Sequence, residues 1–149
     1  MTSKVDETGT TTYYPDLNGN LTNLNENGQS MQQTFDAYNR MSSYMDVNGF
    51  TVQYRRDANG NVTNLIYPGN LTVKYYYDSN NRLTNVTDWS GRQTVITYDL
   101  ASHLTGISRP NNTIRSMSYD NDGELTNIVE QTTTKFPISF YTINYNSAG

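Results

Sequence analysis

Aspartate recurs along this chain at a fixed interval. Five aspartates follow one another at steps of 21 residues, and a sixth precedes them by 20 residues. In order they are Asp16, Asp36, Asp57, Asp78, Asp99 and Asp120. A short fixed period indicates stacked supersecondary units, so the period constrains the fold before composition is considered. Residues such as these aspartates can look like catalytic or metal-binding groups, but we expect them to recur because they are part of the structural repeat.

Each unit contains two segments that have the sequence of β-strands. The first ends at the residue before the aspartate, and in residues 72–77 it alternates and is rich in β-branched and aromatic residues. The second begins with an apolar residue five positions after the aspartate. These apolar residues are Leu21, Met41, Val62, Leu83, Leu104 and Leu125.

Two turns separate the strands of every unit. Asn-Gly within residues 57–61 and Asp-Gly within residues 120–124 favour positive φ and are strong hairpin signals. The second turn is marked by Gly28, Gly49, Asn70, Gly91 and Asn112. No room remains for a helix. We therefore predict an all-β fold, an array of about six 21-residue β-hairpin repeats with roughly twelve strands, forming a continuous, coiled antiparallel sheet.

One face of this sheet is expected to form an aromatic core. In the first strand of each unit every second residue is apolar. Because side chains alternate between the two faces of a strand, these apolar residues lie on a single face. The predicted core positions of the first strand are Val52, Tyr54, Val73, Tyr75, Tyr77, Ile96, Tyr98, Met117 and Tyr119. In the second strand Leu83, Leu104 and Leu125 are assigned to the core, but Leu83 and Val86 are three residues apart rather than two. We favour a β-bulge near Thr84 and Asn85; the alternative is that the two apolar residues face opposite sides.

Composition excludes several classes of function. Only 34% of residues are hydrophobic and mean hydropathy is −0.75, yet 13 tyrosines favour a folded chain. A net charge of −4 with 10 lysines and arginines speaks against nucleic-acid binding. The chain has no cysteine and no apolar run long enough to span a membrane, and its first residues carry no secretory signal. A soluble chain without membrane insertion and without a cofactor is expected.

The ends of the chain interrupt the period. Residues 1–149 are predicted to form one array with repeats beginning near positions 14, 35, 56, 77, 98 and 119 and a partial unit at 145–149. Residues 130–135 would be a lengthened turn, and residues 136–145 a longer strand. The chain is expected to be a piece of a longer protein, with strand edges that make a homodimer plausible.

The consensus resembles the YD repeat of the RHS family. The resemblance rests on residues 77–84 and 119–126, where Tyr-Asp, an Asn or Gly, and Leu-Thr recur in register, and it covers about residues 14–149. Arg56 in the tyrosine position and the turn at residues 99–103, which lacks Gly and Asn, depart from the pattern.

The resemblance implies a spiralling β-shell around a chamber that can hold a toxic C-terminal domain, as in bacterial toxin complexes and polymorphic toxins. Teneurins carry a related shell. It also implies secretion or cell-surface display, and the remainder of a larger RHS-type protein or its toxin cargo as partner. The chain shows no sign of the core segment that ends such arrays. It is therefore interpreted as non-catalytic shell wall.

A carbohydrate-binding or adhesion module is the alternative function. Tyr76 lies on the otherwise polar parity and Trp89 lies in a turn, so both are candidates for stacking on sugar rings, although the simpler interpretation, which we favour, is that they fill gaps between hairpins. Choline- or glucan-binding repeats are disfavoured because they need a tryptophan in nearly every unit. The five Asn-x-Ser/Thr matches are mostly products of the repeat.

Signals for catalysis or metal binding are weak. His103, the only histidine, is expected to be an exposed turn residue without a nucleophile or an orienting partner. A calcium loop beginning at Asp120 fails because its sixth and twelfth positions hold Leu125 and Gln131. We predict that the chain is not an enzyme and has no metal site.

Overall fold

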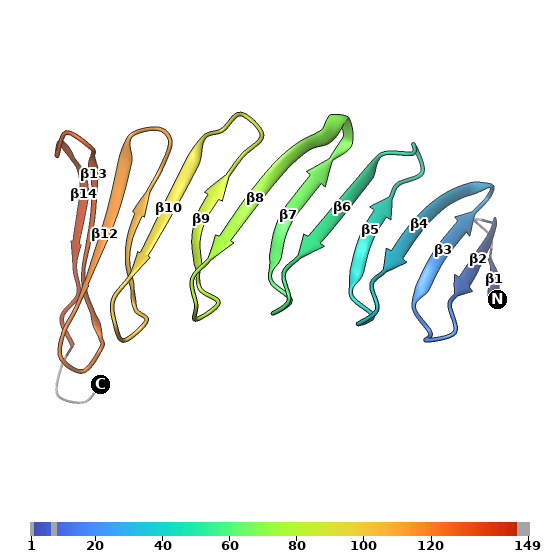
Figure 1. The fold of residues 1–149 in the computed structure, drawn as a ribbon, viewed down its shortest axis with the longest axis horizontal. Helices are drawn as coiled ribbons and strands as arrows, with labels where there is room; N and C mark the ends of the chain where they lie inside the picture. Colours follow the sequence, from blue (N-terminus) through green and yellow to red (C-terminus); the bar gives the residue numbers. More distant parts are fainter. Residues whose placement is uncertain (1, 7–8, 146–149) are drawn as a thin grey trace. The chain divides into compact units, whose positions relative to one another are not determined.

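The computed structural model describes residues 2–6 and 9–145, and the all-β prediction is confirmed. Fourteen strands form one unclosed sheet in which the strand order follows the sequence and neighbouring strands are antiparallel (Figure 1). The first seven strands are β1 (Thr2–Asp6), β2 (Gly9–Pro15), β3 (Leu21–Glu26), β4 (Gln29–Phe35), β5 (Met41–Met45), β6 (Thr51–Arg56) and β7 (Val62–Tyr67). A short 3-10 segment, η1 (Pro68–Asn70), precedes β8 (Leu71–Tyr77). The remaining strands are β9 (Leu83–Thr87), β10 (Gln93–Tyr98), β11 (Leu104–Ser108), β12 (Thr113–Tyr119), β13 (Leu125–Thr132) and β14 (Pro137–Thr142).

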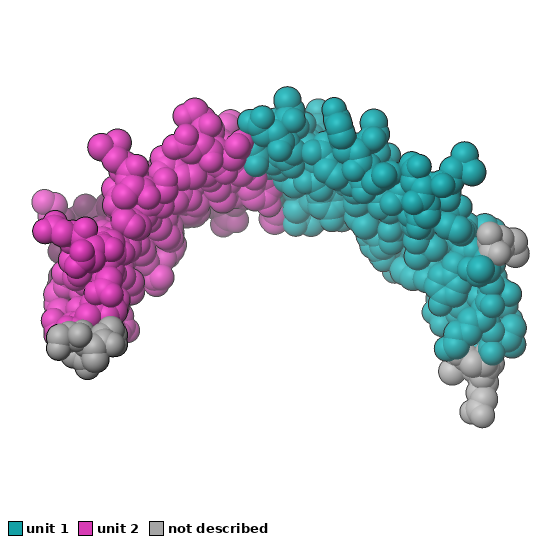
Figure 2. Space-filling view, turned by 90° about the horizontal axis from the view of Figure 1, so that it is seen from below, with its two compact units in different colours: residues 1–74 teal, residues 75–149 magenta. Residues whose placement is uncertain are grey.

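The chain divides into two compact units of similar size. One unit spans residues 1–74 and the other residues 75–149, so the boundary falls within β8 (Figure 2). The first unit contains β1 to β7 with the start of β8, and the second contains the end of β8 with β9 to β14. Each unit is built from the same antiparallel hairpins.

The predicted β-bulge is confirmed in the repeat. In β10 and β11, Thr97 pairs with Gly106 but Tyr98 pairs with Leu104, which leaves Thr105 without a partner. The same shift leaves one residue unpaired in five further hairpins: Thr22, Ser42, Thr63, Thr126 and Ile138. At Thr84, the corresponding position of β9, the hydroxyl group donates to the Tyr76 carbonyl at 3.1 Å, as Thr126 does to Ser118 at 3.0 Å.

The bulge explains why apolar residues three apart share a face. Ile107 pairs with Ile96 and Leu104 pairs with Tyr98, and residues 96 and 98 lie two apart on one face of β10. Directly opposed residues of an antiparallel pair lie on the same face. Leu104 and Ile107 therefore lie on the same face as Tyr98, and Leu125 and Ile128 lie on one face in the same way opposite β12.

The apolar face of each unit is half-buried rather than enclosed. Among the described residues only Val73 counts as buried hydrophobic core, with 9% of its surface exposed. All the other residues assigned to the core from the sequence are half-buried: Val52, Tyr54, Tyr75, Tyr77, Leu83, Ile96, Tyr98, Leu104, Met117, Tyr119 and Leu125. The opposite parity is more open, since Gln53, Lys74 and Ser118 are exposed and Ser116 is half-buried. A single layer cannot cover its apolar face by itself.

Two local predictions at the ends were wrong. The prediction of roughly twelve strands missed β1, whose sequence Thr-Ser-Lys-Val-Asp has no apolar alternation. Residues 130–135 are not a lengthened turn, because β13 continues to Thr132 and Glu130 pairs with both Arg115 in β12 and Ser139 in β14. The additional residues therefore lengthen the strands, and the predicted strand at 136–145 is present as β14. Of the predicted partial unit, residues 146–149 lie outside the described residues.

Candidate functional site

The aspartates open a five-residue loop that connects successive strands. In ten loops of the described chain the N–H of the first residue donates to the carbonyl of the fifth, and the N–H of the fourth donates to the carbonyl of the first. The first residues of these loops are Asp16, Asp36, Asp46, Asp57, Asp78, Asp88, Asp99, Arg109, Asp120 and Thr132. The fourth residue has positive φ in all ten, as at Gly19, Asn39 and Ser102. Glycine and asparagine dominate this position because they tolerate that conformation.

Each aspartate is bound by its own loop. The Oδ1 atom of Asp78 accepts the backbone N–H groups of Asn80 and Arg82, both at 2.9 Å, and its Oδ2 atom accepts the Nε of Arg82 at 2.7 Å. Asp36 is held in the same way by Tyr38 and Arg40. This is an Asx-type turn with an added side-chain bond from the fifth residue. The carboxylate oxygens are thus engaged without any ligand.

These hydrogen bonds lower the pKa of the carboxyl groups of Asp36 and Asp78. The pKa of Asp36 falls from 3.8 to about 2, chiefly because the Arg40 side chain donates to it, with partial desolvation opposing the effect. The pKa of Asp78 is also lowered, first by the backbone N–H of Arg82 and then by its side chain. A group with a lowered pKa stays ionised at neutral pH and is unsuited to act as a general acid.

Two of these aspartate loops were missed by the sequence analysis. Asp46 and Asp88 open loops at the second turn of their units, where the sequence pattern relies on glycine or asparagine as the marker. The overlooked signal is the spacing of the aspartate three residues before Gly49 and Gly91. Other units have Tyr67 or Arg109 in the corresponding position, so the second turn shows no regular aspartate.

The fifth loop residue also contacts the following hairpin. Arg82 lies over the ring of Tyr98, with its guanidinium carbon 4.6 Å from the ring centroid, and its Nη1 atom donates to the Asp99 carbonyl at 3.2 Å and to Ser102 Oγ at 3.0 Å. In the first unit, Asn20 donates to Asn39 Oδ1 at 3.0 Å. One side chain therefore closes its own loop and binds the next loop on the same edge.

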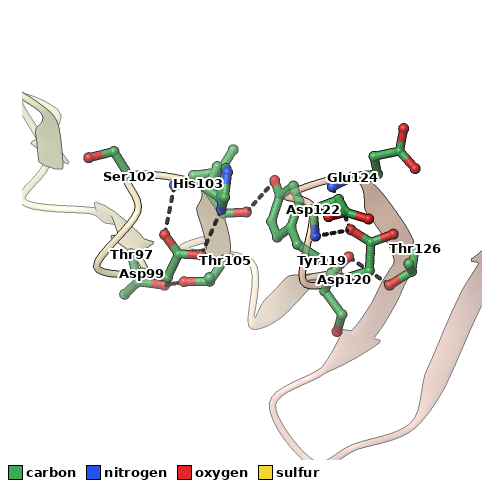
Figure 3. A network of polar contacts seen from close by, with 12 residues as sticks. Thr97, Asp99, Ser102, His103, Thr105, Tyr119, Asp120, Asp122, Glu124 and Thr126 are labelled. Carbon is green, nitrogen blue, oxygen red and sulfur yellow. Dashed lines mark hydrogen bonds and ion pairs between the residues drawn. The ribbon is translucent and has the colours of Figure 1, made fainter. Parts of the chain in front are cut away.

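His103 occupies this fifth position and is not the exposed residue that was expected. Its side chain is 33% exposed, its Nδ1 atom lies 2.9 Å from Asp99 Oδ2, and its ring stacks on Tyr119 with centroids 4.6 Å apart (Figure 3). The sequence interpretation failed because Tyr119 belongs to the next hairpin. Figure 3 shows that Asp120, Asp122 and Glu124 are the next loop, where Asp120 accepts the N–H groups of Asp122 and Glu124. None of these contacts provides a nucleophile for His103.

Where a tyrosine precedes the loop aspartate, as at Tyr98 and Tyr119, its hydroxyl group ties the hairpin to the preceding one. The hydroxyl group of Tyr98 donates to the carbonyl of Leu83 at 3.0 Å. Tyr145 makes the corresponding bond to Leu125 at 3.1 Å over a separation of 20 residues, where Tyr98 bridges 15. The five additional residues in this part of the chain therefore leave the tyrosine contact in place.

Arg56 occupies a position that is tyrosine in other units, so it cannot make the hydroxyl hydrogen bond that Tyr98 makes to the preceding hairpin. Its Nη1 atom donates to the carbonyl of Gly60 at 3.3 Å, while its Nε atom is buried without a hydrogen-bond partner. Arg56 pairs with Val62 on the half-buried face. Arg56 therefore leaves a buried N–H donor without a hydrogen bond among the described residues. The described residues around it do not form a recognisable ligand site.

A second polar cluster lies away from the aspartate loops. Glu130 in β13 accepts Nη1 of Arg109 and, at 2.7 Å, Nε of Arg115 in β12. Its side chain is 16% exposed, and the two arginines lower the pKa of Glu130, with the Arg115 hydrogen bond as the largest cause. The cluster fixes the register of the lengthened strands.

The two aromatic residues proposed for sugar binding do not form one site. Tyr76 is 48% exposed and lies near the end of β8 that leads into the Asp78 loop. Trp89 is 52% exposed and lies in the Asp88 loop, beyond the other end of β9. A five-residue strand spans about 17 Å, so one sugar ring cannot contact both residues.

Metal-binding and membrane-spanning features are not found in the described part of the chain. No group of three or more Asp, Glu or His side chains within residues 2–6 and 9–145 has the arrangement to hold a metal ion. Within the same residues no helix is long and apolar enough to cross a membrane.

Comparison with known proteins gives a family and a fold. The family model described as Teneurin YD-shell matches residues 4–146. The structure of TcdB2-TccC3 without its hypervariable C-terminal region is similar over 97% of this chain, with a TM-score of 0.77 and 15% identity. The Tc holotoxin pore of Photorhabdus luminescens is similar over 94% of this chain, with a TM-score of 0.73 and 15% identity. The chain spans 9% of the length of each of these two structures. A comparison with curated protein sequences finds no match.

Proposed function

Because this chain belongs to the teneurin YD-shell family, we propose that it is a non-catalytic structural module within a larger protein. In this proposal its hairpins form a segment of the β-shell that encloses or displays a toxin or effector domain. The solved structures with the same fold include a Tc holotoxin pore, and the chain spans 9% of the length of the matched chain. A wall segment of a much longer shell is the role that fits both facts.

The observation that carries the proposal is how the polar groups are used. The carboxylate oxygens of Asp36, Asp78 and Asp99 accept hydrogen bonds within their own loops. The hydroxyl groups of Tyr98 and Tyr119 bind the main chain of the preceding hairpin. The carboxylates thus close their own loops and the tyrosine hydroxyl groups join neighbouring hairpins, so both serve the array itself, as expected for a repeat protein whose units are stabilised by their neighbours.

Electron microscopy of the intact protein tests the proposal. We expect a hollow β-shell that contains this segment in its wall and holds further density from the same polypeptide inside. A structure in which the segment projects as an isolated array, with no polypeptide enclosed or attached for display, would contradict it.

Carbohydrate binding is a second candidate, supported by the exposure of one aromatic side chain in a polar loop. Trp89 follows Asp88, which is paired with Arg92 at 2.6 Å, so an aromatic ring stands beside fixed polar groups. Aromatic rings with adjacent polar groups suit a small polar ligand. Glycan-array binding that is lost in Trp89→Ala and retained in Tyr76→Ala is the expected result; an unchanged profile in Trp89→Ala would reject this candidate.

A further inference from the structure

Four asparagines of the chain are followed directly by glycine: Asn18, Asn27, Asn48 and Asn59. An asparagine in this position can lose its side-chain amide spontaneously, because the nitrogen of the next residue can attack the amide carbon. Glycine hinders that attack least, since it has no Cβ atom. The sequence offers the same chemistry at all four positions, so the surroundings of each asparagine decide which one reacts.

Two of these asparagines are held by a neighbouring hairpin. The Nδ2 atom of Asn18 donates to Oδ1 of Asn39, in the next aspartate loop, at 3.1 Å. The Oδ1 atom of Asn27 accepts the backbone N–H of Thr10 at 3.1 Å. Each hydrogen bond has to break before the side chain can turn its amide carbon toward the following glycine nitrogen.

The third pair is restrained at its glycine. Gly60, which follows Asn59, is half-buried, and the Nη1 atom of Arg40 lies 2.7 Å from the position that a Cβ on Gly60 would take. The guanidinium group therefore covers the backbone that would have to move during ring closure.

Asn48 is held more weakly. Its Nδ2 atom lies 3.5 Å from Oδ2 of Asp46 in its own loop, beyond the usual range of N–H···O distances. Asn48 and Gly49 are both exposed, and no atom of the described chain lies within 4 Å of the position that a Cβ on Gly49 would take. Both the amide and the glycine therefore have room to rearrange.

We propose that Asn48 is a site of spontaneous deamidation and isoaspartate formation. The Gly49 nitrogen forms a bond to Cγ of Asn48, the Cγ–Nδ2 bond breaks, and the proton of the Gly49 N–H leaves with the amide group as ammonia. Water then opens the resulting succinimide ring. Addition of water at Cγ gives aspartate, whereas addition at the main-chain carbonyl carbon gives isoaspartate, in which the main chain runs through Cβ. The proposal is independent of the proposed shell function.

Either product disturbs the loop that joins β5 to β6. The new carboxylate takes the place of an amide that faces the Asp46 carboxylate, so two like charges become neighbours. Isoaspartate also adds a methylene group to the main chain between Asp46 and Phe50, where the Asp46 N–H donates to the Phe50 carbonyl at 3.0 Å. The modification is therefore expected to weaken this turn.

Peptide mapping of the intact protein by mass spectrometry tests the site. Incubation in heavy-oxygen water labels the products formed during incubation, and electron-transfer fragmentation distinguishes aspartate from isoaspartate. We expect Asn48 to be converted about fivefold or more faster than Asn18, the difference that one hydrogen bond makes in a rate. In denaturant the two rates should converge. Faster conversion at another of the four asparagines, equal rates in the folded protein, or a difference that persists in denaturant would overturn the proposal.

Release of Asn18 tests the physical reason for the choice of site. Asn39→Gly removes the Oδ1 acceptor, and glycine tolerates the φ of 58° at this position. Conversion of Asn18 should become about fivefold faster, and that of Asn48 should not change. The matched variant Asn70→Gly, at a φ of 62°, should leave both rates unchanged. An Asn18 rate that does not respond to Asn39→Gly would overturn the explanation; circular dichroism verifies that each variant is folded.

Discussion

The hydroxyl group of Tyr119 donates a hydrogen bond to the main-chain carbonyl of Leu104 at 2.9 Å. On the same tyrosine, the ring stacks on His103, the fifth residue of the preceding loop. The tyrosine of the Tyr-Asp pair is therefore the residue that joins hairpins, while the aspartate shapes the loop.

Removal of the Tyr119 hydroxyl group should destabilise the protein. Tyr119→Phe loses the bond to Leu104 and leaves that carbonyl unpaired, which is expected to cost about 1 kcal/mol. The matched variant Tyr14→Phe, on the exposed polar parity, should change the free energy of unfolding by less than about 0.5 kcal/mol. Urea unfolding followed by circular dichroism measures both, and equal effects would contradict the assigned role.

Acid should weaken the fold through the loop aspartates. The pKa of Asp36 is about 2 in the folded chain against an ordinary 3.8. A folded-state pKa below the unfolded value gives a stabilisation that is present above about pH 4 and is lost as the pH falls toward 2. Asp36→Asn should lower stability at neutral pH and flatten the loss between pH 4 and pH 2. Urea midpoints over this range measure the slope; an unchanged slope would show that Asp36 ionisation does not support the loop.

At the fourth loop position, substitution by glycine should raise the stability of the fold and substitution of a glycine by alanine should lower it. Lys135 has a φ of 65° and Gly91 a φ of 78°. Left-handed conformations cost a residue with a Cβ atom about 1 kcal/mol. Lys135→Gly should therefore stabilise by up to about 1 kcal/mol, and Gly91→Ala should destabilise by about the same amount. No atom lies within 4 Å of the position that a Cβ on Gly91 would take, so a large loss there would indicate a cause other than backbone strain.

Glu124 is the acidic residue among the fifth residues of the ten described loops, and it offers a gain-of-stability test. Arg82 and Arg92 donate to the aspartates of their loops, whereas Glu124 brings a second carboxylate to Asp120. Glu124→Arg should restore the ion pair and raise stability by at most about 1 kcal/mol, the upper range for exposed pairs. The increase should disappear in the double variant with Asp120→Asn; a gain that persists would place the effect elsewhere.

The parts of this fold that are repeated could be predicted from the sequence, and the parts that depend on a neighbour could not. The strand and turn periods and the bulge follow from local residue choice, as at Leu83 and Val86. The environment of His103 depends on Tyr119, which lies on the next hairpin, so no local pattern reveals it. The extension of β13 depends on the pairing of Glu130 with Arg109 and Arg115, again across strands. In a repeat protein the fold class is determined by local sequence. Burial and strand register at the irregular positions are determined by contacts with neighbouring hairpins.

Limited proteolysis of the intact protein tests the proposed shell role most directly. The polypeptide enclosed by the shell should resist cleavage in the wild type. It should become accessible when Tyr98→Ala and Tyr119→Ala together loosen the contacts between hairpins, with Tyr14→Ala as the matched control that preserves resistance. Mass spectrometry identifies the fragments released. Equal accessibility in the wild type and the double variant would contradict the account of this chain as part of an enclosing wall.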